Sequence, residues 1–595
     1  MRRNLSIVAA FLLTLALPQG RALAGVPIPE IDLPINDSAL EINTTGTGNN
    51  DYFIDLTKVS PSFFQNNYAV LDTRITYDLS KVANPSCPPN ITLRTSDSTK
   101  AGLAYVRRSS ANNVAVQRVA IAQPRERQYL LQVRRDGTGV ATSGPCVTLT
   151  NLSVPYTLKV TLAREAALGV GGGFAYAVQH MPTRGDGEPS IAVDKRNNNV
   201  YISAPVGGPA VVGGMPGGVD FWRSLNGGAT FTYSQPVFSL NATGGFDSHI
   251  AIDRSGTVYM LDLAATTIFV GRSIDSGGSW TGIVPAGNDA DREWIAVYGP
   301  TANGTIKAFI SYHDINVDNY PWECVSPDGG ATWPTVCNPM LTDPEALADG
   351  FDNTTIGPQV FDSTGTVYDV ISTPKAGDVN LTYRSIWLAR SSDGKNFTNK
   401  LIHRAPVGYD TGGLFPTIAV DSADNLYAVW SERLAPSGSS VVMLSYSTDH
   451  GDHWSPPQTI STPGQSALLP WVTAFAPGMV DVTWTGSTTG SSNDPTANWY
   501  QYVAQNRAVL TSSTWTTSRV SSHPIRYGTV CLSGIGCSTA GDDGRILLDF
   551  TSIDADSFGN AHLTYANSGP EGYLGNPSMT YTDYAKQTSG RRIVR

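Results

Sequence analysis

Charged side chains gather in several short segments that each lead into an apolar, strand-like run. These segments are Arg184-Gly185-Asp186-Gly187-Glu188, Phe246-Asp247-Ser248-His249, Asp289-Ala290-Asp291-Arg292-Glu293-Trp294, Tyr409-Asp410 and Gly541-Asp542-Asp543-Gly544-Arg545. An arginine can hold a carboxylate through two parallel hydrogen bonds, and Asp and Glu offer hard oxygen ligands. Side chains of these types suit a polar site for an anionic ligand or for a cation.

Two other interpretations use the same residues. The charged side chains can pair with one another and cap strand ends, which is the ordinary structural role of such groups. Alternatively, Ca²⁺ can bind where carboxylates converge, and the candidate ligands are Glu188, Asp247, Asp291 and Asp549. The positions belong to separate repeats, so their spacing does not support a calcium site. We expect that no cofactor is required, and Ca²⁺ is the one cofactor that remains a candidate.

A short turn motif occurs five times along the chain, and the repeated units that contain it must position these segments. Its pattern is Ser-x-Asp-x-Gly-x-x-Trp, here called the Ser-x-Asp turn, and the clearest copy runs from Ser326 to Trp333. The other copies are Ser273, Asp275, Gly277, Trp280; Ser447, Asp449, Gly451, Trp454; Ser224, Asn226, Gly228, Phe231; and Ser391, Asp393, Phe397, one residue short. The carboxyl can accept backbone N–H groups, Gly can take positive φ, and the aromatic ring can pack beneath the hairpin. We expect Trp280, Trp333 and Trp454 to be largely buried.

A second repeated unit is an apolar strand, then Asp, a turn, and a strand that ends in an aromatic residue. It runs from Ile191 to Tyr201, from Ile250 to Tyr259 and from Ile418 to Tyr427, with degenerate copies that begin at Ile295, Val360, Val472 and Ile553. Such units predict the first and second strands of successive propeller blades, which require forty to fifty residues each. The count favours seven blades. Six blades remain an alternative if the unit near Val472 or the one near Ile553 is an insertion and not a blade.

The repeated turns resemble the Asp-box (BNR) repeat of the sialidase-like propeller superfamily, over about residues 174 to 590. The resemblance implies an all-β fold with a six- or seven-bladed propeller, in which a strand from Phe174 to Val178 can complete the last blade. It also implies that the Asp-box residues are scaffold on the face opposite the site: Asn226, Asp275, Asp328, Asp393 and Asp449. The site would be built from the loops that precede each innermost strand, here called entry loops.

Sialidases hold the substrate carboxylate with three arginines and use a Tyr nucleophile assisted by Glu, with an Asp acid/base. By resemblance, Arg184, Arg292 and Arg545 are the ligand-binding arginines. The catalytic candidates are Tyr409 or Tyr527, Glu188 or Glu293, and Asp247 or Asp291. The Arg-Ile-Pro signature of the family is absent, because Glu188 precedes Pro189-Ser190-Ile191.

The chain before the repeats divides into four parts. Residues 1–24 have the basic start, apolar run and small-residue end of a signal peptide, with cleavage near Ala24. Residues 25–44 are rich in Pro, Asn and Thr and are expected to form an extended leader. Alternating apolar runs over residues 45–163 predict an accessory β-sandwich. A Gly-rich linker over residues 164–173 then leads to the propeller, residues 174–590.

Composition and cysteines agree with a secreted strand-rich protein. The net charge is −10 and charged residues make up 15% of the sequence, with no basic run that would suggest a nucleic-acid partner. No later stretch is apolar enough to span a membrane. The six cysteines predict three local disulfides in an oxidising compartment: Cys87 with Cys146, Cys324 with Cys337, and Cys531 with Cys537.

Two classes of function remain open at this stage. One is a secreted, exo-acting glycoside hydrolase of sialidase type that acts on extracellular glycans, and the other is a non-catalytic propeller that binds a glycan or a protein. In both, the expected partner is an extracellular glycan or glycoprotein, and the protein is expected to be monomeric.

Overall fold

The computed structural model describes residues 30–594 with gaps. The gaps are 37, 39, 48, 61–67, 78–89, 97–101, 109–113, 123–127, 137–154, 165–173, 182–185, 206–218, 237–244, 265, 284–289, 315–319, 335, 351–352, 379–381, 436–437, 463–464, 488, 495–496, 523, 528, 533–546 and 569–579. The predicted signal peptide, Cys87, Cys146 and Cys537 therefore lie outside the described residues. The domain limits inferred from the sequence stay predictions.

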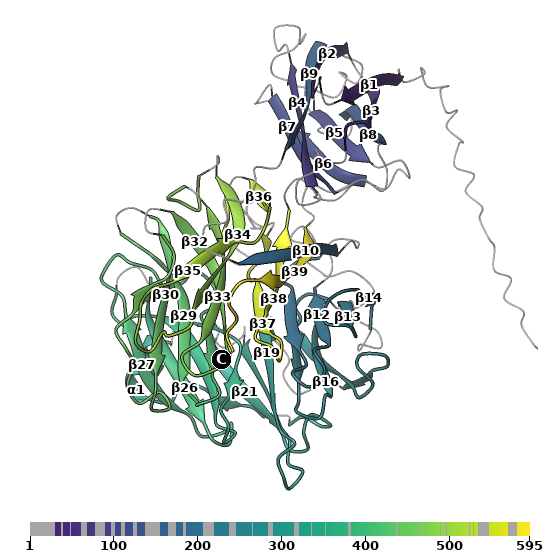
Figure 1. Ribbon diagram of the computed structural model, residues 1–595. Coiled ribbons are helices and arrows are strands. Elements are labelled where there is room, and N and C mark those ends of the chain that lie inside the picture. The colour runs from purple at the N-terminus through teal and green to yellow at the C-terminus, as the bar shows by residue number, and fades with distance from the viewer. Residues whose placement is uncertain are drawn as a thin grey trace, which may run out of the picture.

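The N-terminal strands form a two-sheet sandwich, as predicted (Figure 1). One sheet has the order β1-β3-β8-β5-β6 and the other β2-β9-β4-β7. The strands are β1 (Glu30–Asn36), β2 (Glu41–Thr47), β3 (Asn50–Lys58), β4 (Tyr68–Tyr77), β5 (Asn90–Ser96), β6 (Gly102–Arg108), β7 (Val114–Ala122), β8 (Gln128–Asp136) and β9 (Pro155–Arg164). Alternate side chains of β3, β8 and β9 point inward, and buried residues such as Ile54, Leu131 and Leu158 fill the space between the sheets.

The expectation of an extended leader over residues 25–44 is wrong for its described part. Strand β1 pairs in parallel with β3, and β2 pairs antiparallel with β9, so both belong to the sandwich. The physical reason is the alternation of Ile31, Leu33 and Ile35 with polar residues. This alternation gives β1 one apolar face, and Leu33 and Ile35 are buried in the core. The Pro and Thr residues of this segment conceal the alternation of apolar and polar residues in the sequence.

The rest of the described chain forms seven sheets of at least four strands each, here called blades 1 to 7 (Figure 1). Blades 1 to 3 consist of β11 (Ser190–Val193), β12 (Val200–Ala204), β13 (Asp220–Ser224), β14 (Thr232–Ser234); β15 (Ile250–Ile252), β16 (Val258–Ala264), β17 (Thr267–Ser273), β18 (Thr281–Ile283); and β19 (Ala290–Tyr298), β20 (Lys307–Asp314), β21 (Tyr320–Ser326), β22 (Asn338–Pro339).

Blades 4 to 7 continue the same antiparallel order. They consist of β23 (Thr355–Ile356), β24 (Val360–Phe361), β25 (Val367–Pro374), β26 (Tyr383–Ser391), β27 (Thr398–Arg404); β28 (Thr417–Val420), β29 (Leu426–Arg433), β30 (Ser440–Ser447), β31 (Gln458–Thr459); β32 (Ser466–Ala474), β33 (Val480–Ser487), β34 (Asn498–Asn506), β35 (Thr516–Arg519), β36 (Arg526–Tyr527); and β37 (Ser552–Ala555), β38 (Ala561–Asn567), β39 (Tyr581–Ser589), β10 (Ala175–Met181).

The seven sheets close into a ring. The innermost strands β11, β15, β19, β24, β28, β32 and β37 contact one another in that order, and β37 contacts β11. The seven starts inferred from the sequence all lie on these strands. Blade 7 takes its outer strand from the beginning of the ring, because β10 pairs with β39. This closure protects the strand edges. It also joins residues that are separated in the sequence by almost the whole length of the propeller.

The antiparallel order divides each blade into two ends. Turns from the first to the second strand and from the third to the fourth lie at one end, and the entry loops lie at the other. At the turn end, Oδ1 of Asp253 accepts the backbone N–H groups of Ser255, Gly256 and Thr257 at 2.8–2.9 Å. The hydroxyl of Tyr259 then donates to the Gly329 carbonyl in the Ser-x-Asp turn of the next blade.

The Ser-x-Asp turns have the hydrogen bonds that their residue types predict. In the copy at Ser326, the Gly330 N–H donates to the Ser326 hydroxyl at 2.7 Å and the Thr332 N–H donates to Asp328 at 2.7 Å. Gly330 has φ of +84°, where a Cβ would meet the ring of Tyr259 at 2.8 Å, so glycine is required there. The Gly–Ser bond recurs in the other four copies.

The aromatic residues of these turns are less buried than expected. Phe397 is buried, but Trp280, Trp333 and Trp454 are half-buried and pack at the margins of the blade cores. Each ring follows a turn at the rim of its blade, so it contacts the core without being enclosed by it.

Basic side chains at the turn end connect neighbouring blades. Arg390 of blade 4 donates to the His450 carbonyl and to Asp452 of blade 5, both at 2.7 Å. Arg223 donates in the same way to Ser276, and Lys586 of blade 7 donates to Gly227 of blade 1. Each donor binds the residue three positions after the Ser of the Ser-x-Asp turn in the next blade. The repeated turns therefore stabilise the contacts between blades as well as the individual blades.

We expect Arg390→Met to lower the free energy of unfolding by about 1–3 kcal/mol, because it removes two charge-assisted hydrogen bonds between blades while keeping an aliphatic stem. Lys395→Met, an exposed change in the same blade, is the matched control and should leave the melting temperature unchanged. Thermal unfolding of the two variants measures the difference. Equal melting temperatures for both would contradict a structural role for the connection.

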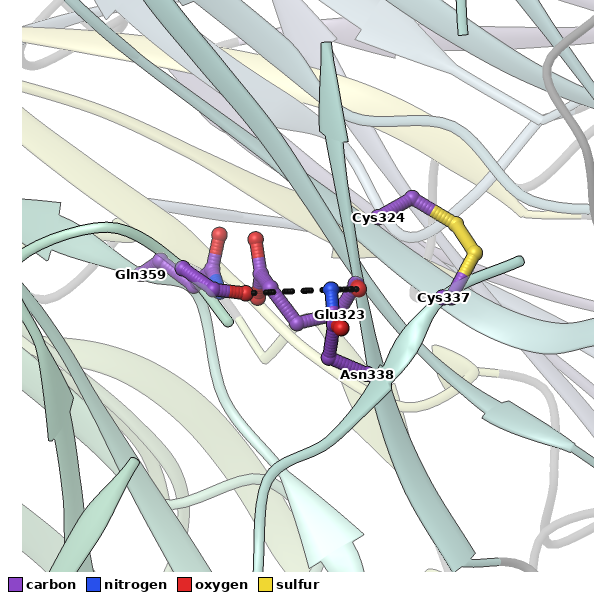
Figure 2. The surroundings of a disulfide bond; sticks show 6 residues. Glu323, Cys324, Cys337, Asn338 and Gln359 are labelled. Atoms are coloured by element: carbon purple, nitrogen blue, oxygen red, sulfur yellow. Dashed lines mark hydrogen bonds between the residues drawn. A yellow bond between two sulfur atoms is a disulfide. The ribbon is translucent and has the colours of Figure 1, made fainter. Parts of the chain in front are cut away.

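A disulfide joins Cys324 on β21 to Cys337, the residue before β22, which confirms the predicted pairing (Figure 2). Beside it, the buried Glu323 accepts a hydrogen bond from the side-chain amide of Gln359 in blade 4. Asn338 donates to the Glu323 carbonyl at 3.4 Å. Cys531 is also disulfide-bonded. The described residues include one helix, α1 (Pro344–Asp349), and no helix among them is long and apolar enough to cross a membrane.

Candidate functional site

The entry-loop end of the ring brings together charged residues from separate blades. Glu188 stands before β11, Asp247 before β15, and Arg292 and Glu293 lie in β19; these four are here called the Arg292 cluster. Glu188 and Arg292 have φ of +47° and +49°, which is uncommon for residues other than glycine. Strained backbone of this kind marks positions where the surrounding structure holds a side chain in place.

The guanidinium of Arg292 is the centre of the cluster. Its Nη1 donates to Oε2 of Glu188 at 2.9 Å and to Oδ1 of Asp247 at 3.3 Å, and its Nη2 donates to the Ser248 carbonyl at 2.9 Å. Arg292 is only 4% exposed and Glu188 only 2%. The second oxygen of Glu188 accepts the N–H of Asp549, which precedes β37. One ion-paired network therefore joins blades 7, 1, 2 and 3.

Aromatic rings enclose the same guanidinium. The carbon Cζ of Arg292 lies 4.2 Å from the ring centre of Trp294 and 4.6 Å from that of Phe550. Phe415 and Trp471 complete a group of rings whose centres are 5.3 to 5.6 Å from Trp294. Cation–π contact with several desolvated faces stabilises a buried Arg. It also excludes water from the ion pairs.

The neighbouring titratable groups are held neutral. Burial, together with the negative charge of Asp247, raises the pKa of Glu293 well above its ordinary value. Burial, together with the positive charge of Arg292, lowers the pKa of His249 to about 3, and its Nδ1 accepts the Ile295 N–H at 3.2 Å. Burial also lowers the pKa of His313 to about 3. Burial thus favours the uncharged forms of Glu293, His249 and His313, while Arg292 is ion-paired with Glu188 and Asp247.

The structure brings four predicted site residues together and places others elsewhere. Glu188, Asp247, Arg292 and Glu293 form the cluster, and Asp291 lies beside it in β19, partly exposed. Tyr409 belongs to the entry loop of blade 5, next to the ion pair of Asp410 with Arg433 at 2.8 Å. Tyr527 is in β36, the strand that pairs with β34. Arg184 and Arg545 lie outside the described residues, so the predicted arginine triad remains a prediction.

Sequence reasoning missed the aromatic enclosure and the two neutral histidines. A signal was available, because Trp294 and Trp471 each immediately precede a strand start that the repeat had identified. An aromatic residue at that place in several blades indicates a ring of side chains that converges on the channel. His249 occupies the same position, immediately before Ile250, whereas His313 carried no such repeated signal.

The cation between Glu188 and Asp247 is the guanidinium of Arg292 itself. Within the described part of the chain, no group of three or more His, Cys, Asp or Glu residues is arranged to hold a metal ion. Of the carboxylates weighed as calcium ligands, Glu188 and Asp247 are therefore seen here in ion pairs with Arg292.

No protein-family model matches the sequence, and no curated protein matches it. Among solved structures, the chain is similar to a protein of unknown function from Dyadobacter fermentans, at 12% identity over 70% of this chain and 98% of that one, with a TM-score of 0.40. It is similar to an α-L-arabinanase from Penicillium chrysogenum at 12% identity over 69% and 97%, with a TM-score of 0.37. It is similar to a leech intramolecular trans-sialidase at 10% identity over 92% and 98%, with a TM-score of 0.38.

Proposed function

We propose that the protein is an extracellular propeller of the sialidase-like type that binds a carbohydrate through its entry loops without hydrolysing it. The observation that carries this choice is the state of Arg292. Its guanidinium is buried, paired with Glu188 and Asp247 and enclosed by Trp294 and Phe550. A guanidinium held in this way has no exposed donor for the carboxylate of a sialoside.

Two further features support the carbohydrate-binding and extracellular parts of the proposal. The Ser-x-Asp turns resemble the Asp box of sialidase-like propellers in sequence, and they form the turn hydrogen bonds that this pattern predicts. The disulfide between Cys324 and Cys337 and the predicted signal peptide agree with an oxidising compartment. Asp247, whose side chain is 15% exposed, and the half-buried Asp291 offer hydrogen-bond acceptors to sugar hydroxyls at the rim.

Glycoside hydrolysis is the second candidate, and one observation favours it. Burial raises the pKa of Glu293, which lies near Asp247, and two carboxyl groups in different environments can divide the roles of acid and base. In that case Glu293 would donate a proton to the leaving oxygen. Because Glu293 is fully buried, this role requires the entry loops to open and admit substrate.

The test compares glycan binding with hydrolysis by the same preparation. The full-length secreted protein is applied to a glycan array and incubated with a panel of sialosides and other aryl glycosides. The proposal expects binding to a defined group of glycans and no turnover above a buffer control. Turnover that disappears in Glu293→Gln but persists in Glu323→Gln would establish hydrolysis instead. Glu323 is the matched control because it is also a buried carboxyl with a raised pKa, caused by burial, in the same blade.

A further inference from the structure

A separate pocket lies at the turn end of the ring, between blades 6 and 7. One wall is the turn that follows β34, with Arg507, Ser512 and Thr514, together with Thr516 at the start of β35. The other wall is the segment that follows β39, with Arg591. Phe174, just before β10, forms part of the lining. The pocket encloses about 600 Å³, within the range of sites for small molecules. By the strand order it lies at the opposite end of the ring from the Arg292 cluster.

The pocket carries positive charge without compensation. Nη2 of Arg507 donates to the Val594 carbonyl at 3.1 Å, while its Nε is buried and has no acceptor. Among the residues that the structure describes, no carboxylate pairs with Arg507 or with Arg591. Arg507 lines the pocket, and the Nη groups of its guanidinium can donate to an anion bound there.

Side-chain hydrogen bonds fix both walls of the pocket. Asn506 holds the turn in shape, because its amide donates to the Ser512 carbonyl at 2.7 Å and its oxygen accepts the Ala508 N–H at 2.8 Å. On the other wall, Gln587 donates to the Arg591 carbonyl at 2.6 Å. The exposed hydroxyls of Thr514 and Thr516 are placed on the pocket lining, where they can bind hydroxyl groups of a ligand.

From these features we infer that the pocket binds a sugar acid, a single hydroxylated ring with one carboxylate. The carboxylate would lie between Arg507 and Arg591, where guanidinium groups can bind it through paired hydrogen bonds. The ring hydroxyls would contact Thr514 and Thr516. This site is independent of the proposed function at the entry loops, and it gives the protein a place to bind the carboxylate of an acidic sugar.

The experiment is isothermal titration of the full-length secreted protein with glucuronic acid, glucose and inorganic sulfate as separate probes. We expect glucuronic acid to bind, glucose not to bind, and binding to weaken as salt is raised. Sulfate that binds as tightly as glucuronic acid would overturn the assignment to a sugar acid, and so would glucose binding as well as glucuronic acid. No detectable binding of glucuronic acid would overturn the site itself.

Two variants and one control locate the site. Arg507→Gln and Arg591→Gln should each weaken glucuronic acid binding by about tenfold or more, since a hydrogen bond to a charged group contributes about 1.5–3 kcal/mol. Arg591 is exposed, so its replacement should leave the melting temperature unchanged even if Arg507→Gln disturbs the contact with Val594. Arg592→Gln, exposed and adjacent but not in the lining, is the control. Binding that Arg591→Gln leaves intact would overturn the inference.

Discussion

Replacing Arg292 by Met is expected to lower the free energy of unfolding by about 3–5 kcal/mol. Methionine keeps an apolar stem against Trp294 and Phe550 but leaves Glu188 and Asp247 without their cation. Removing one partner of a buried ion pair costs about this much because the remaining charge stays desolvated. Denaturant unfolding followed by tryptophan fluorescence measures the loss.

A double variant separates the ion pair from simple packing. Adding Glu188→Gln to Arg292→Met removes one of the stranded charges, so the double variant should be more stable than Arg292→Met alone. Arg519→Met is the matched control: Arg519 also lies over a ring, 4.5 Å from the centre of Tyr500, but is partly exposed. It should cost less than about 1 kcal/mol. Equal losses in both Met variants would mean that the Arg292 network contributes nothing beyond ring contact.

The second large effect expected is a fall in stability as the pH rises from about 4 to about 8. Burial raises the pKa of Asp262 to about 6 and that of Asp481 to about 7, and it raises those of Glu293, Glu323 and Asp369 well above their ordinary values. A carboxyl whose pKa is higher in the folded state stabilises the fold fully below its unfolded pKa. That stability is lost as the pH rises through the folded pKa.

Asp481 gives the clearest single-residue case. Its pKa rises from 3.8 to about 7, and because one tenfold change in proton affinity is about 1.4 kcal/mol, the loss between those pH values is roughly 4 kcal/mol. Asp481→Asn removes the titrating group and keeps an acceptor for the Gln505 amide, which donates to Oδ1 at 2.9 Å. The variant should therefore lose less stability between pH 4 and pH 8 than the parent, by about that amount.

On the acid side of the profile, stability changes with pH in the opposite direction. Backbone N–H groups of Ser279 and His453 lower the pKa values of Asp275 and Asp449 in the Ser-x-Asp turns. Their stabilising contribution is present above the unfolded pKa and is lost as the pH falls. Stability should therefore be greatest near pH 4 to 5. Denaturant unfolding across this range tests both limbs. A profile that stays flat to pH 8 would contradict the protonation of the buried carboxyls.

The sequence by itself determined the parts of the fold that depend on local chemistry. The hydrogen bonds of the Ser-x-Asp turn join residues at most six positions apart, so Ser326, Asp328 and Gly330 were sufficient to predict them. The apolar strand starts depend on a period of two within a few residues. Their positions, the strand-rich class and the Cys324–Cys337 disulfide were therefore predictable.

Only the tertiary structure decided what the charged entry loops do. Arg292 and Glu188 are 104 positions apart, and Glu188 meets Asp549 across the closure of the ring. Burial also decides the charge of each side chain. A carboxyl group stays charged where it is paired with a guanidinium, and it is held neutral where it is only desolvated. Residue type gives a side chain its chemistry, but pairing and access to water depend on which blades become neighbours. That is why the Ser-x-Asp turns could be predicted, while the burial of Arg292 required the assembled ring.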